Sequence, residues 1–583
     1  MEWDQLLCTT RQRAKELPQG RRFSRALELD SFDDDFLSIV SSQAFRRLQD
    51  KTQVFPLDKS DFVRTRLTHS MEVSTIARYL AQMIAEDCDD LRGRAEHVGT
   101  IAACAGLLHD TGNPPFGHYG EEVIRDWFRR QFRADSFAFR GQPVREMFNA
   151  ADPRMTADFE HFEGNAQGLR ILSKAGLRDG SHDVNLTYAV MNTLIKYPNP
   201  STDFDRDSAD VKRHKMGYYY AEREIMDAVC TATGTKVDGA YVRHPLVYIM
   251  EAADDIAYAT ADLADAVKKG RFTVTDFIQY YEKESNAVID RQMEAFIGQF
   301  RDDAALHEKL RRYYDVHLLM RAKAAVDWTY RDQDELKRMD AERRALFQTP
   351  VEQDVLRQLE AVKDRAKDAR NRLNDLRKRV SAARAAEQEE AARGRSVLRR
   401  TLSHSDTPES EFAIFENWLE EVRLWLMRSA ADAFREHYAA IMAGTFPGEL
   451  CEGSEALHIM KKAMAAFVYD AQELITLELS AKRIVESLLE DLIHAVLYAD
   501  EPDEAEHMTT IDDRFLHMIP DNFKMDYLGA KAQIERRVKS GAQTRENADA
   551  EELYLRFLMV TDFISGMTDS FARNLYRIAN GMD

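Results

Sequence analysis

The chain of 583 residues lacks the features that mark secreted, disulfide-stabilised or membrane-spanning proteins. Its five cysteines are scattered without the paired spacing of metal ligands, so we expect reduced thiols in a cytoplasmic protein. The first residues, "MEWDQLLCTTRQRAKELPQG", lack the apolar stretch of a signal peptide. No run of about 18 apolar residues occurs anywhere, which predicts that no segment spans a membrane.

Positive charge is also in deficit. The chain has 80 lysines and arginines against 100 acidic residues, a net charge of −20. This balance disfavours sequence-independent binding of nucleic acid as the main activity, because such binding depends on positive charge. Two basic stretches, residues 11–25 and 377–400, leave single-stranded DNA open as an allosteric partner. The alternative is that both stretches are solvated helix faces.

Proline (14 residues) and glycine (25 residues) are scarce for this length, and apolar residues recur at spacings of three and four. Both features predict an all-α, mainly helical fold. Residues 1–345 carry nearly all the unusual polar clusters, and we expect them to form the functional core. Residues 346–410 are expected to form a charged helical insertion with a mobile loop, and residues 411–583 a C-terminal helical region.

Residues 351–393 contain neither glycine nor proline and show a heptad pattern of apolar residues. One interpretation is a coiled-coil arm for oligomerisation or for a partner. The other is a charged helical hairpin that packs on its own domain. The residues of the pattern are Val355, Leu359, Val362, Ala366, Ala369, Leu373, Leu376, Val380 and Ala383.

Histidine and aspartate occur together at places where helices are expected to begin or end. His69 falls in the first turns of a predicted helix, and His109-Asp110 ends an apolar run that Gly112 stops. A lone histidine such as His69 is more often structural. The second cluster favours a metal, because imidazole and carboxylate together suit a divalent transition metal or an ion such as Mg²⁺ or Mn²⁺.

A further acidic pattern lies in "IMEAADDIAYATADLADAV", residues 249–267. Asp254, Tyr258 and Asp262 are spaced i, i+4, i+8 along an otherwise apolar helix. Such a stripe can be a solvated face, but buried carboxylates need a metal or a hydrogen-bonding ligand. With His69, His109 and Asp110, Asp254 would complete two imidazoles and two carboxylates, which leaves positions on an octahedral ion for water and substrate. These four residues predict a hydrolase-type metal site.

The turn that follows, "DTGNPPFGHYGEE", places His118 three residues before Glu121. If a helix begins near Tyr119, Glu121 can orient the imidazole of His118, which would make a general acid or base. The alternative is that Glu121 is an ordinary acidic residue in the first turn of a helix.

A series of motifs, in this order along the chain, resembles the HD-domain phosphohydrolases, and among them the bacterial deoxyguanosinetriphosphate triphosphohydrolases. The resemblance spans most of the chain outside residues 350–410. Its motifs are "FRRLQDKTQVFPL" (45–57), "RTRLTHSMEV" (64–73), "GLLHDTGNPPFGHYGEE" (106–122), "HFEGNAQGLRIL" (161–172), "IKYP" (195–198), "IMEAADDIAYATADLADAV" (249–267) and "GMTDSFARNLY" (566–576).

The resemblance implies hydrolysis of dGTP, or of another dNTP, at the α-phosphate to a deoxynucleoside and inorganic triphosphate. It implies a Mg²⁺, Mn²⁺ or Co²⁺ cofactor, a homo-oligomer (commonly a hexamer), and a C-terminal region that completes the nucleotide site and the oligomer contacts. The residues it implies are His69, His109, Asp110 and Asp254 for the metal; His118 and Glu121 for catalysis; Gln53 and Asp262 for the sugar 3′-hydroxyl; Tyr258 under the deoxyribose; Arg66, Lys196, Tyr197 and Lys215 for the triphosphate; and His161 lining the site.

Two alternatives stay open. An HD phosphohydrolase could act on another nucleotide, although the lysines and arginines above favour a triphosphate. A nucleotide-sensing or single-strand-DNA-sensing scaffold could keep the same fold, although a complete ligand set together with His118 argues against a decayed site.

Overall fold

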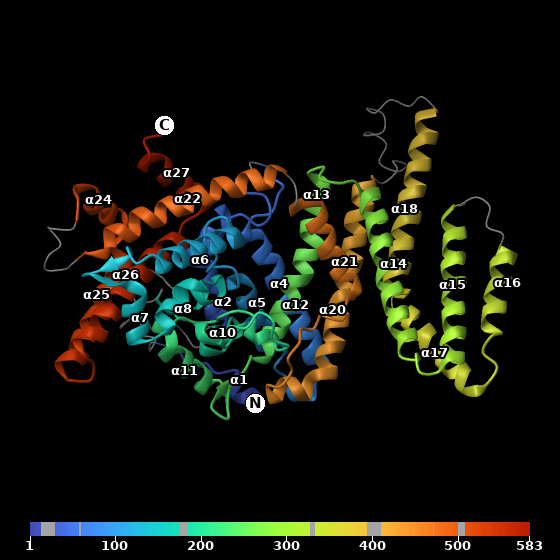
Figure 1. Ribbon diagram of the computed structural model, residues 1–583, viewed down its shortest axis with the longest axis horizontal. Coiled ribbons are helices and arrows are strands. Elements are labelled where there is room, and N and C mark those ends of the chain that lie inside the picture. The colour runs from blue at the N-terminus through green and yellow to red at the C-terminus, as the bar shows by residue number, and fades with distance from the viewer. Residues whose placement is uncertain are drawn as a thin grey trace, which may run out of the picture. The chain divides into compact units, whose positions relative to one another are not determined.

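A computed structural model describes residues 1–12, 30–56, 60–174, 184–326, 333–365, 367–392, 410–469, 472–499 and 508–582. Almost all of its regular structure is helical, which confirms the expected all-α class (Figure 1). The described strands form two short antiparallel hairpins, β1 (Ala138–Phe139) with β2 (Gln142–Pro143) and β3 (Lys236–Val237) with β4 (Ala240–Tyr241). Within the described ranges, no helix has the length and apolar character needed to cross a membrane.

The chain packs as two compact units. Unit 1 contains residues 1–265, 423–453 and 468–583, and unit 2 contains residues 266–422 and 454–467. Packing therefore divides the chain at other residues than the predicted functional boundaries at 345/346 and 410/411, which remain a prediction. Most of the basic stretch 11–25, and the predicted mobile loop up to residue 409, lie outside the described residues.

Unit 1 holds every residue that the sequence singles out as functional. Its helices are α1 (Trp3–Leu6), α2 (Ser31–Ser41), α3 (Gln43–Arg47), η2 (Leu48–Asp50), α4 (Arg66–Asp87), η3 (Asp89–Leu91), α5 (Ala95–Leu108), α6 (Gly117–Arg133), α7 (Val144–Ala151), α8 (Arg154–Glu160), α9 (Gly164–Lys174), α10 (Tyr188–Thr193), η5 (Ser201–Asp203), η6 (Val211–Arg213), η7 (Tyr220–Glu222), α11 (Arg223–Ala232), α12 (Pro245–Ala257), η8 (Tyr258–Asp262), α22 (Gln472–Leu497), α24 (Thr510–Met518), α25 (Asp521–Lys539), α26 (Arg545–Ser565) and α27 (Asp569–Ala579).

Unit 2 is a set of helices packed side by side. It contains α14 (Val274–Gly298), α15 (Ala304–Val326), α16 (Gln333–Arg344), α17 (Pro350–Arg365), α18 (Lys367–Ala392) and α21 (Glu455–Met464). Helices α13 (Leu263–Lys268) and α20 (Glu411–Ala443) and the π-helical turn η9 (Ala465–Tyr469) run across the division between the units.

The heptad stretch lies on α17 and α18. Its residues Val355 and Leu359 are buried in a core shared with α14 and α15, which includes Ile289 and Tyr313. The apolar face is therefore covered within unit 2 itself. Packing on the chain's own unit is thus observed for Val355 and Leu359, and the hairpin form of residues 351–393 stays a prediction.

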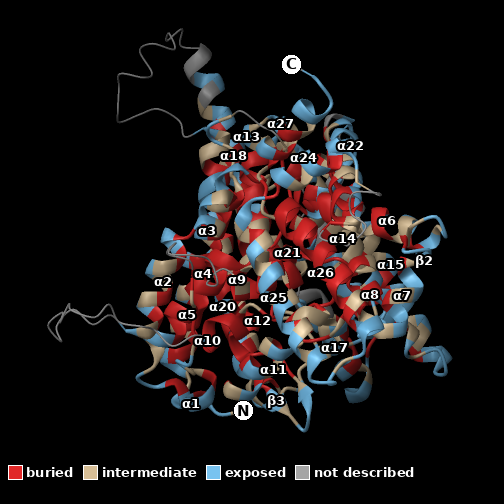
Figure 2. Cartoon of the chain, turned by 90° about the vertical axis from the view of Figure 1, so that its left-hand side faces the viewer, coloured by how far each residue is buried: buried red, intermediate tan, exposed pale blue. Residues whose placement is uncertain are grey.

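Helix α5 is the centre of the site-bearing part of unit 1. Every residue from Val98 to Leu108 is buried, and helices α2, α4, α10 and α12 all pack against α5 (Figure 2). An apolar helix surrounded in this way cannot turn polar side chains to solvent along its length. After Thr100 the next strongly polar side chains, His109 and Asp110, therefore come only at its C-terminal end.

Gly106 lets α4 and α5 approach closely near that end. A Cβ atom at Gly106 would lie 2.6 Å from the Cα of Ser74 and 2.7 Å from its backbone nitrogen. Because backbone atoms of α4 occupy this space, a larger residue would have to separate the helices that carry His69 and His109.

A second core joins the C-terminal region to the first half of the chain. Residues 550–565 of α26 are all buried, and Tyr554 and Phe557 pack on the aromatic side chains of Phe148 and Phe159. In the same contact, Asp562 accepts hydrogen bonds from Arg170 at 2.7 and 2.8 Å and from Gln167 at 2.8 Å. The C-terminal helices are thus part of the folded core that supports the site.

We predict that Gly106→Ala lowers the thermal midpoint by several degrees, because overpacking of this kind costs about 1–3 kcal/mol. Gly529→Ala is the matched control, since Gly529 lies on α25 and no atom lies within 4 Å of the position that its Cβ atom would take. Alanine there should be neutral or mildly stabilising. Differential scanning fluorimetry measures both, and equal midpoints for the two variants would show that α4 and α5 are not in this close contact.

Candidate active site

Three of the predicted metal ligands form one cluster. Candidate ligand atoms of His69, His109 and Asp110 all lie within 4.8 Å of one another. The histidine rings are 5.5 Å apart between centroids and approach edge to face. Asp254 joins them from α12, with its Oδ1 3.1 Å from His69 Nε2 and 3.5 Å from His109 Nε2. The structure thus brings together the four residues predicted as metal ligands, from three helical segments.

The surroundings of His109 suit an imidazole that ligates a metal cation through Nε2. Its Nδ1 lies 2.8 Å from the Gly106 carbonyl, and a donated hydrogen bond there leaves the Nε2 lone pair of the neutral ring free. Nε2 is buried and has no hydrogen-bond partner among the described residues. Burial opposes a charged ring, but the carboxylates of Asp110 and Asp254 raise the pKa of His109 to about 10. The two carboxylates thus favour positive charge at His109 Nε2, which fits a divalent ion held by the four residues.

Two cations balance the carboxylates of the cluster. Arg66 Nη1 lies 2.5 Å from Asp110 Oδ2, and Lys196 Nζ lies 3.2 Å from Asp254 Oδ2. Burial alone would raise the pKa of each carboxyl, but these cations and His109 hold both pKa values well below their usual range. Both carboxylates are therefore ionised, as ligation requires.

The turn between α5 and α6 re-aims the chain toward the cluster. Phe116 and Gly117 both have positive φ angles, +65° and +61°, and α6 begins at Gly117. A Cβ atom at Gly117 would lie 2.4 Å from Arg66 Nη2, so glycine serves both the backbone conformation and the approach of Arg66. The turn ends with His118 in the first turn of α6.

His118 and Glu121 form the expected pair, with Nδ1 and Oε1 3.4 Å apart. The Glu121 carboxylate raises the pKa of His118 above its ordinary value, and its own pKa is lowered despite burial, chiefly by His118. The side chain of Glu121 is only 2% exposed, whereas that of His118 is 72% exposed. Glu121 is therefore a buried partner of the histidine and not a solvated first-turn acid.

Sequence reasoning missed Glu163, a second buried carboxylate beside this pair. Lys215 Nζ lies 2.8 Å from Glu163 Oε1, and Arg125 Nη1 lies 3.7 Å from Glu121 and 3.6 Å from Glu163. Burial and the nearby Glu121 raise the pKa of Glu163. The available signal was its place in the motif "HFEGNAQGLRIL", next but one to His161.

A cavity of about 210 Å³ opens onto these groups. It brings the two carboxylates of the cluster and the His118 side chain together with Lys196 and Lys215, two of the cations expected to hold a triphosphate. His69, His109 and Arg66 are not among its described lining residues. Its lining residues are Asp110, Asn113, His118, Asn165, Lys196, Tyr197, Lys215, Glu251, Asp254, Asp255 and Glu449.

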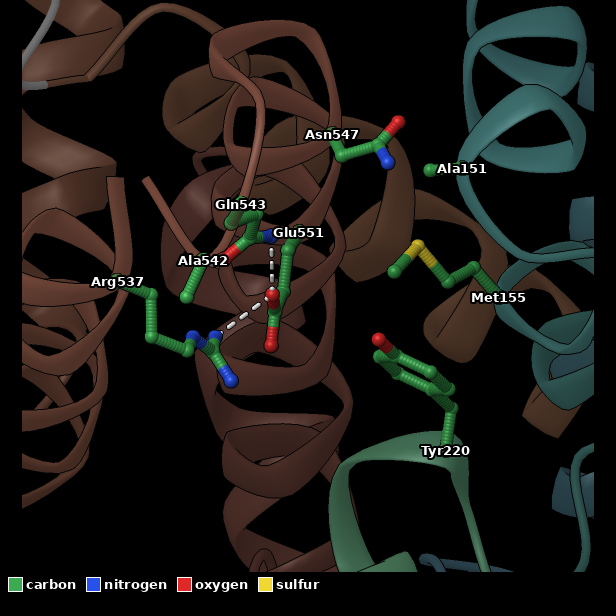
Figure 3. A pocket seen from close by; sticks show the side chains of 8 residues that line it. All are labelled: Ala151, Met155, Tyr220, Arg537, Ala542, Gln543, Asn547 and Glu551. Carbon is green, nitrogen blue, oxygen red and sulfur yellow. Dashed lines mark hydrogen bonds and ion pairs between the residues drawn. The ribbon is translucent and has the colours of Figure 1, made fainter. Parts of the chain in front are cut away.

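A second cavity of unit 1, also about 210 Å³, has a different chemistry (Figure 3). There Glu551 accepts hydrogen bonds from Arg537 at 2.7 Å and Gln543 at 2.8 Å, opposite Tyr220 and Met155. None of its eight described lining residues is a histidine or an aspartate. The first cavity is therefore the candidate active site.

Two of the predicted sugar-binding residues, Tyr258 and Asp262, lie on a helix that changes its winding. The regular helix expected for residues 249–267 is interrupted, because η8, which begins at Tyr258 and ends at Asp262, is a π-helical turn. Asp262 is fully buried, and neither of its carboxylate oxygens has a hydrogen-bond partner among the described residues. Burial raises its pKa to about 7, although the nearby His69 opposes the shift. Gln53 Oε1 is likewise buried and unpartnered.

His161 lies somewhat apart from these groups. Its ring stacks on Phe204, with centroids 4.7 Å apart, and its Nδ1 is 3.5 Å from Arg129. Burial and the charges of Arg129 and Arg125 lower its pKa to about 4. Its expected role in lining the active site stays a prediction.

Comparisons with known proteins agree with this geometry. A family model of the HD domain matches residues 66–150, which include His69, His109, Asp110, His118 and Glu121. The chain is 34% identical, over the full length of both chains, to deoxyguanosinetriphosphate triphosphohydrolase-like proteins of Listeria monocytogenes and Listeria innocua. The chain belongs to this family. A third member, from Synechocystis sp., is 40% identical over 46% of this chain and 61% of its own length. Membership of this HD-domain family supports a phosphohydrolase, and the histidine–aspartate cluster is suited to the metal that such an enzyme requires.

We predict that His109→Ala and Asp110→Ala each weaken Mn²⁺ binding at least about tenfold, because each variant removes a ligand. His97→Ala is the matched control, since His97 lies on the same helix but is half exposed and faces Asp30 at 3.5 Å. Isothermal titration calorimetry after treatment with a chelator measures the affinities. Unchanged binding in both ligand variants would show that the metal sits elsewhere.

Proposed function

We propose that the chain is a metal-dependent dNTP triphosphohydrolase that prefers dGTP and cleaves at the α-phosphate. The observation that supports it best is one cavity lined by the cluster carboxylates Asp110 and Asp254, by His118 and by the cations Lys196 and Lys215. A triphosphate is strongly anionic, and such cations stabilise it. The names of the relatives support guanine as the base.

In this proposal His69, His109, Asp110 and Asp254 hold Mg²⁺, Mn²⁺ or Co²⁺. When bound, the ion would supply Lewis acidity to the attacking water and the reacting phosphoryl oxygen. The residues of the chain do the rest. Arg66, Lys196, Tyr197 and Lys215 bind and orient the triphosphate.

His118 would act as the general base. Its Nδ1 faces Glu121, so Nε2 is the atom that can accept a proton from the attacking water. The carboxylate of Glu121 stabilises the imidazolium that results. Attack at the α-phosphorus breaks the bond to the sugar 5′-oxygen, which takes up a proton, and the products are the deoxynucleoside and intact triphosphate.

Gln53 and Asp262 would bind the 3′-hydroxyl of the sugar. Both present buried oxygen atoms without a partner among the described residues, and a hydroxyl group would supply the missing hydrogen bond. Tyr258 would pack against the deoxyribose and leave no room for a 2′-hydroxyl. Two further properties stay predictions: a homo-oligomer, commonly a hexamer, which the resemblance implies, and single-stranded DNA as an allosteric partner, which the basic stretches 11–25 and 377–400 leave open.

Product analysis tests the reaction. We expect purified protein with Mg²⁺, Mn²⁺ or Co²⁺ to convert dGTP to deoxyguanosine and inorganic triphosphate, resolved by chromatography, and to act more slowly on the other dNTPs. Asp110→Ala should abolish turnover, because it removes a metal ligand and the partner of Arg66. Release of dGMP and pyrophosphate would place the cleaved bond elsewhere. Absence of turnover with every dNTP would contradict the proposal.

The pH profile tests His118. A general base works in its neutral form, and Glu121 raises the pKa of His118, so kcat/KM should fall with decreasing pH around a midpoint above 6.5. Glu121→Gln removes the charge that stabilises the imidazolium, so the midpoint should move to lower pH and the plateau should drop. Glu122→Gln, an exposed neighbour, is the control. A midpoint that stays in place in Glu121→Gln would assign the base to another group.

A further inference from the structure

Two π-helical turns meet beside the proposed sugar site. The first, η8, begins at Tyr258, and the second, η9, ends at Tyr469. The two hydroxyl oxygens are 2.7 Å apart although the residues are 211 positions apart in sequence. π-Helical turns are rare and occur frequently at functional sites, because the extra residue re-aims the side chains that follow. A hydrogen bond that joins two such turns indicates that the directions of the Tyr258 and Tyr469 side chains are constrained.

The surroundings of the pair are those of the sugar site. Tyr258 lies four residues before Asp262, whose carboxylate is fully buried without a partner among the described residues. Burial raises the pKa of Tyr258 to about 12, and burial together with the charges of neighbouring residues, Asp262 among them, raises that of Tyr469 further. Both phenols are therefore neutral, and one hydroxyl donates to the other. The charge of Arg66 also acts on Tyr469. This places the pair near the phosphate-binding and the sugar-binding groups alike.

The bond occupies the hydroxyl of Tyr258. A phenol held by a second phenol keeps its ring in one orientation and has less capacity left for a new partner. If either tyrosine lost its hydroxyl, the ring of Tyr258 would lose this anchor and could tilt away, and the 2′-hydroxyl of a ribonucleotide could then enter the space that the ring fills. Rejection of ribose by a steric clash of this kind depends on the ring keeping one orientation.

We propose that Tyr469 is a positioning residue that fixes Tyr258 through this hydroxyl pair and thereby makes the site selective for 2′-deoxyribose over ribose. The proposal rests on the proposed function of the site. Tyr469 belongs to the C-terminal half of the chain and is absent from every motif that carries the resemblance.

The test compares kcat/KM for dGTP and GTP in the wild-type protein, Tyr469→Phe, Tyr258→Phe and the double variant. One hydrogen bond between neutral groups corresponds to about a threefold to tenfold change, so each single variant should reduce the dGTP-to-GTP ratio by this factor. The double variant should lose no more than either single variant, because both remove the same bond. Tyr241→Phe is the matched control, since its hydroxyl also makes a 2.7 Å bond, to Asp227.

A role in stability alone would lower the thermal midpoint of Tyr469→Phe without changing the ratio, and that result would overturn the inference. So would a reduced ratio in Tyr258→Phe with an unchanged ratio in Tyr469→Phe, or a wild-type protein that does not distinguish dGTP from GTP. Dissociation constants for both nucleotides, measured with His118→Ala, give the same ratio without turnover. They separate failure of this inference from failure of the proposed reaction.

Discussion

The buried carboxylate of Asp569 holds the active-site loops in place. One oxygen accepts the backbone N–H of Phe116 at 2.9 Å, and the other accepts both the backbone N–H and the hydroxyl of Thr52. Lys51 reinforces this junction through its ammonium group, which donates to the carbonyls of Asn113 and Ser565 at 2.5 and 2.7 Å. Burial raises the pKa of Asp569 and lowers that of Lys51 to about 7, so both groups depend on these partners. One hub thus fixes the turn that leads to His118 and the loop that carries Gln53.

The ion pairs around the metal cluster are explained by the geometry of the site and not by a contribution to the stability of the fold. Asp110 and Asp254 are carboxylates withdrawn from much of the solvent, and Arg66 and Lys196 are the cations that compensate them. Buried ion pairs of this kind are often no more stabilising than apolar residues of the same volume. Their value lies in geometry. Lys196 holds one oxygen of Asp254 and leaves the other directed toward His69 and His109. In Asp110, Arg66 and His109 approach the same oxygen, and the other oxygen accepts a hydrogen bond from Asn113. The same arrangement explains why His109 has such a strong affinity for positive charge.

Local sequence patterns predicted the helical class, and they named the four residues that the structure brings together in the cluster. His109, Asp110, His118 and Glu121 are separated by a few residues and one rigid turn, so chain geometry alone nearly determines how they meet. The heptad pattern was ambiguous, because an apolar stripe looks the same whether its partner is another chain or α14. Asp569 and Tyr469 could not be assigned roles, since their partners lie 453 and 211 residues away. The π-helical turn at Tyr258 was missed because an i, i+4 spacing presupposes regular α-helical winding.

The residues whose roles local sequence patterns could not predict have one physical property in common, which is the distance over which they act. Groups that hold a metal and move a proton must meet within a few ångströms, and a compact motif around a single turn can supply them. A sugar and a base extend beyond that distance, so the residues that enclose them have to come from segments that only the tertiary fold brings close. In this chain Asp569 on α27 bonds to Thr52, next to Gln53, and Tyr469 bonds to Tyr258, and both of these partners come from the C-terminal half. In the proposed function, selectivity for the nucleotide would depend on the packing between the two halves of unit 1. The chemistry would depend on the HD motif, together with Asp254 and Lys196 from outside it.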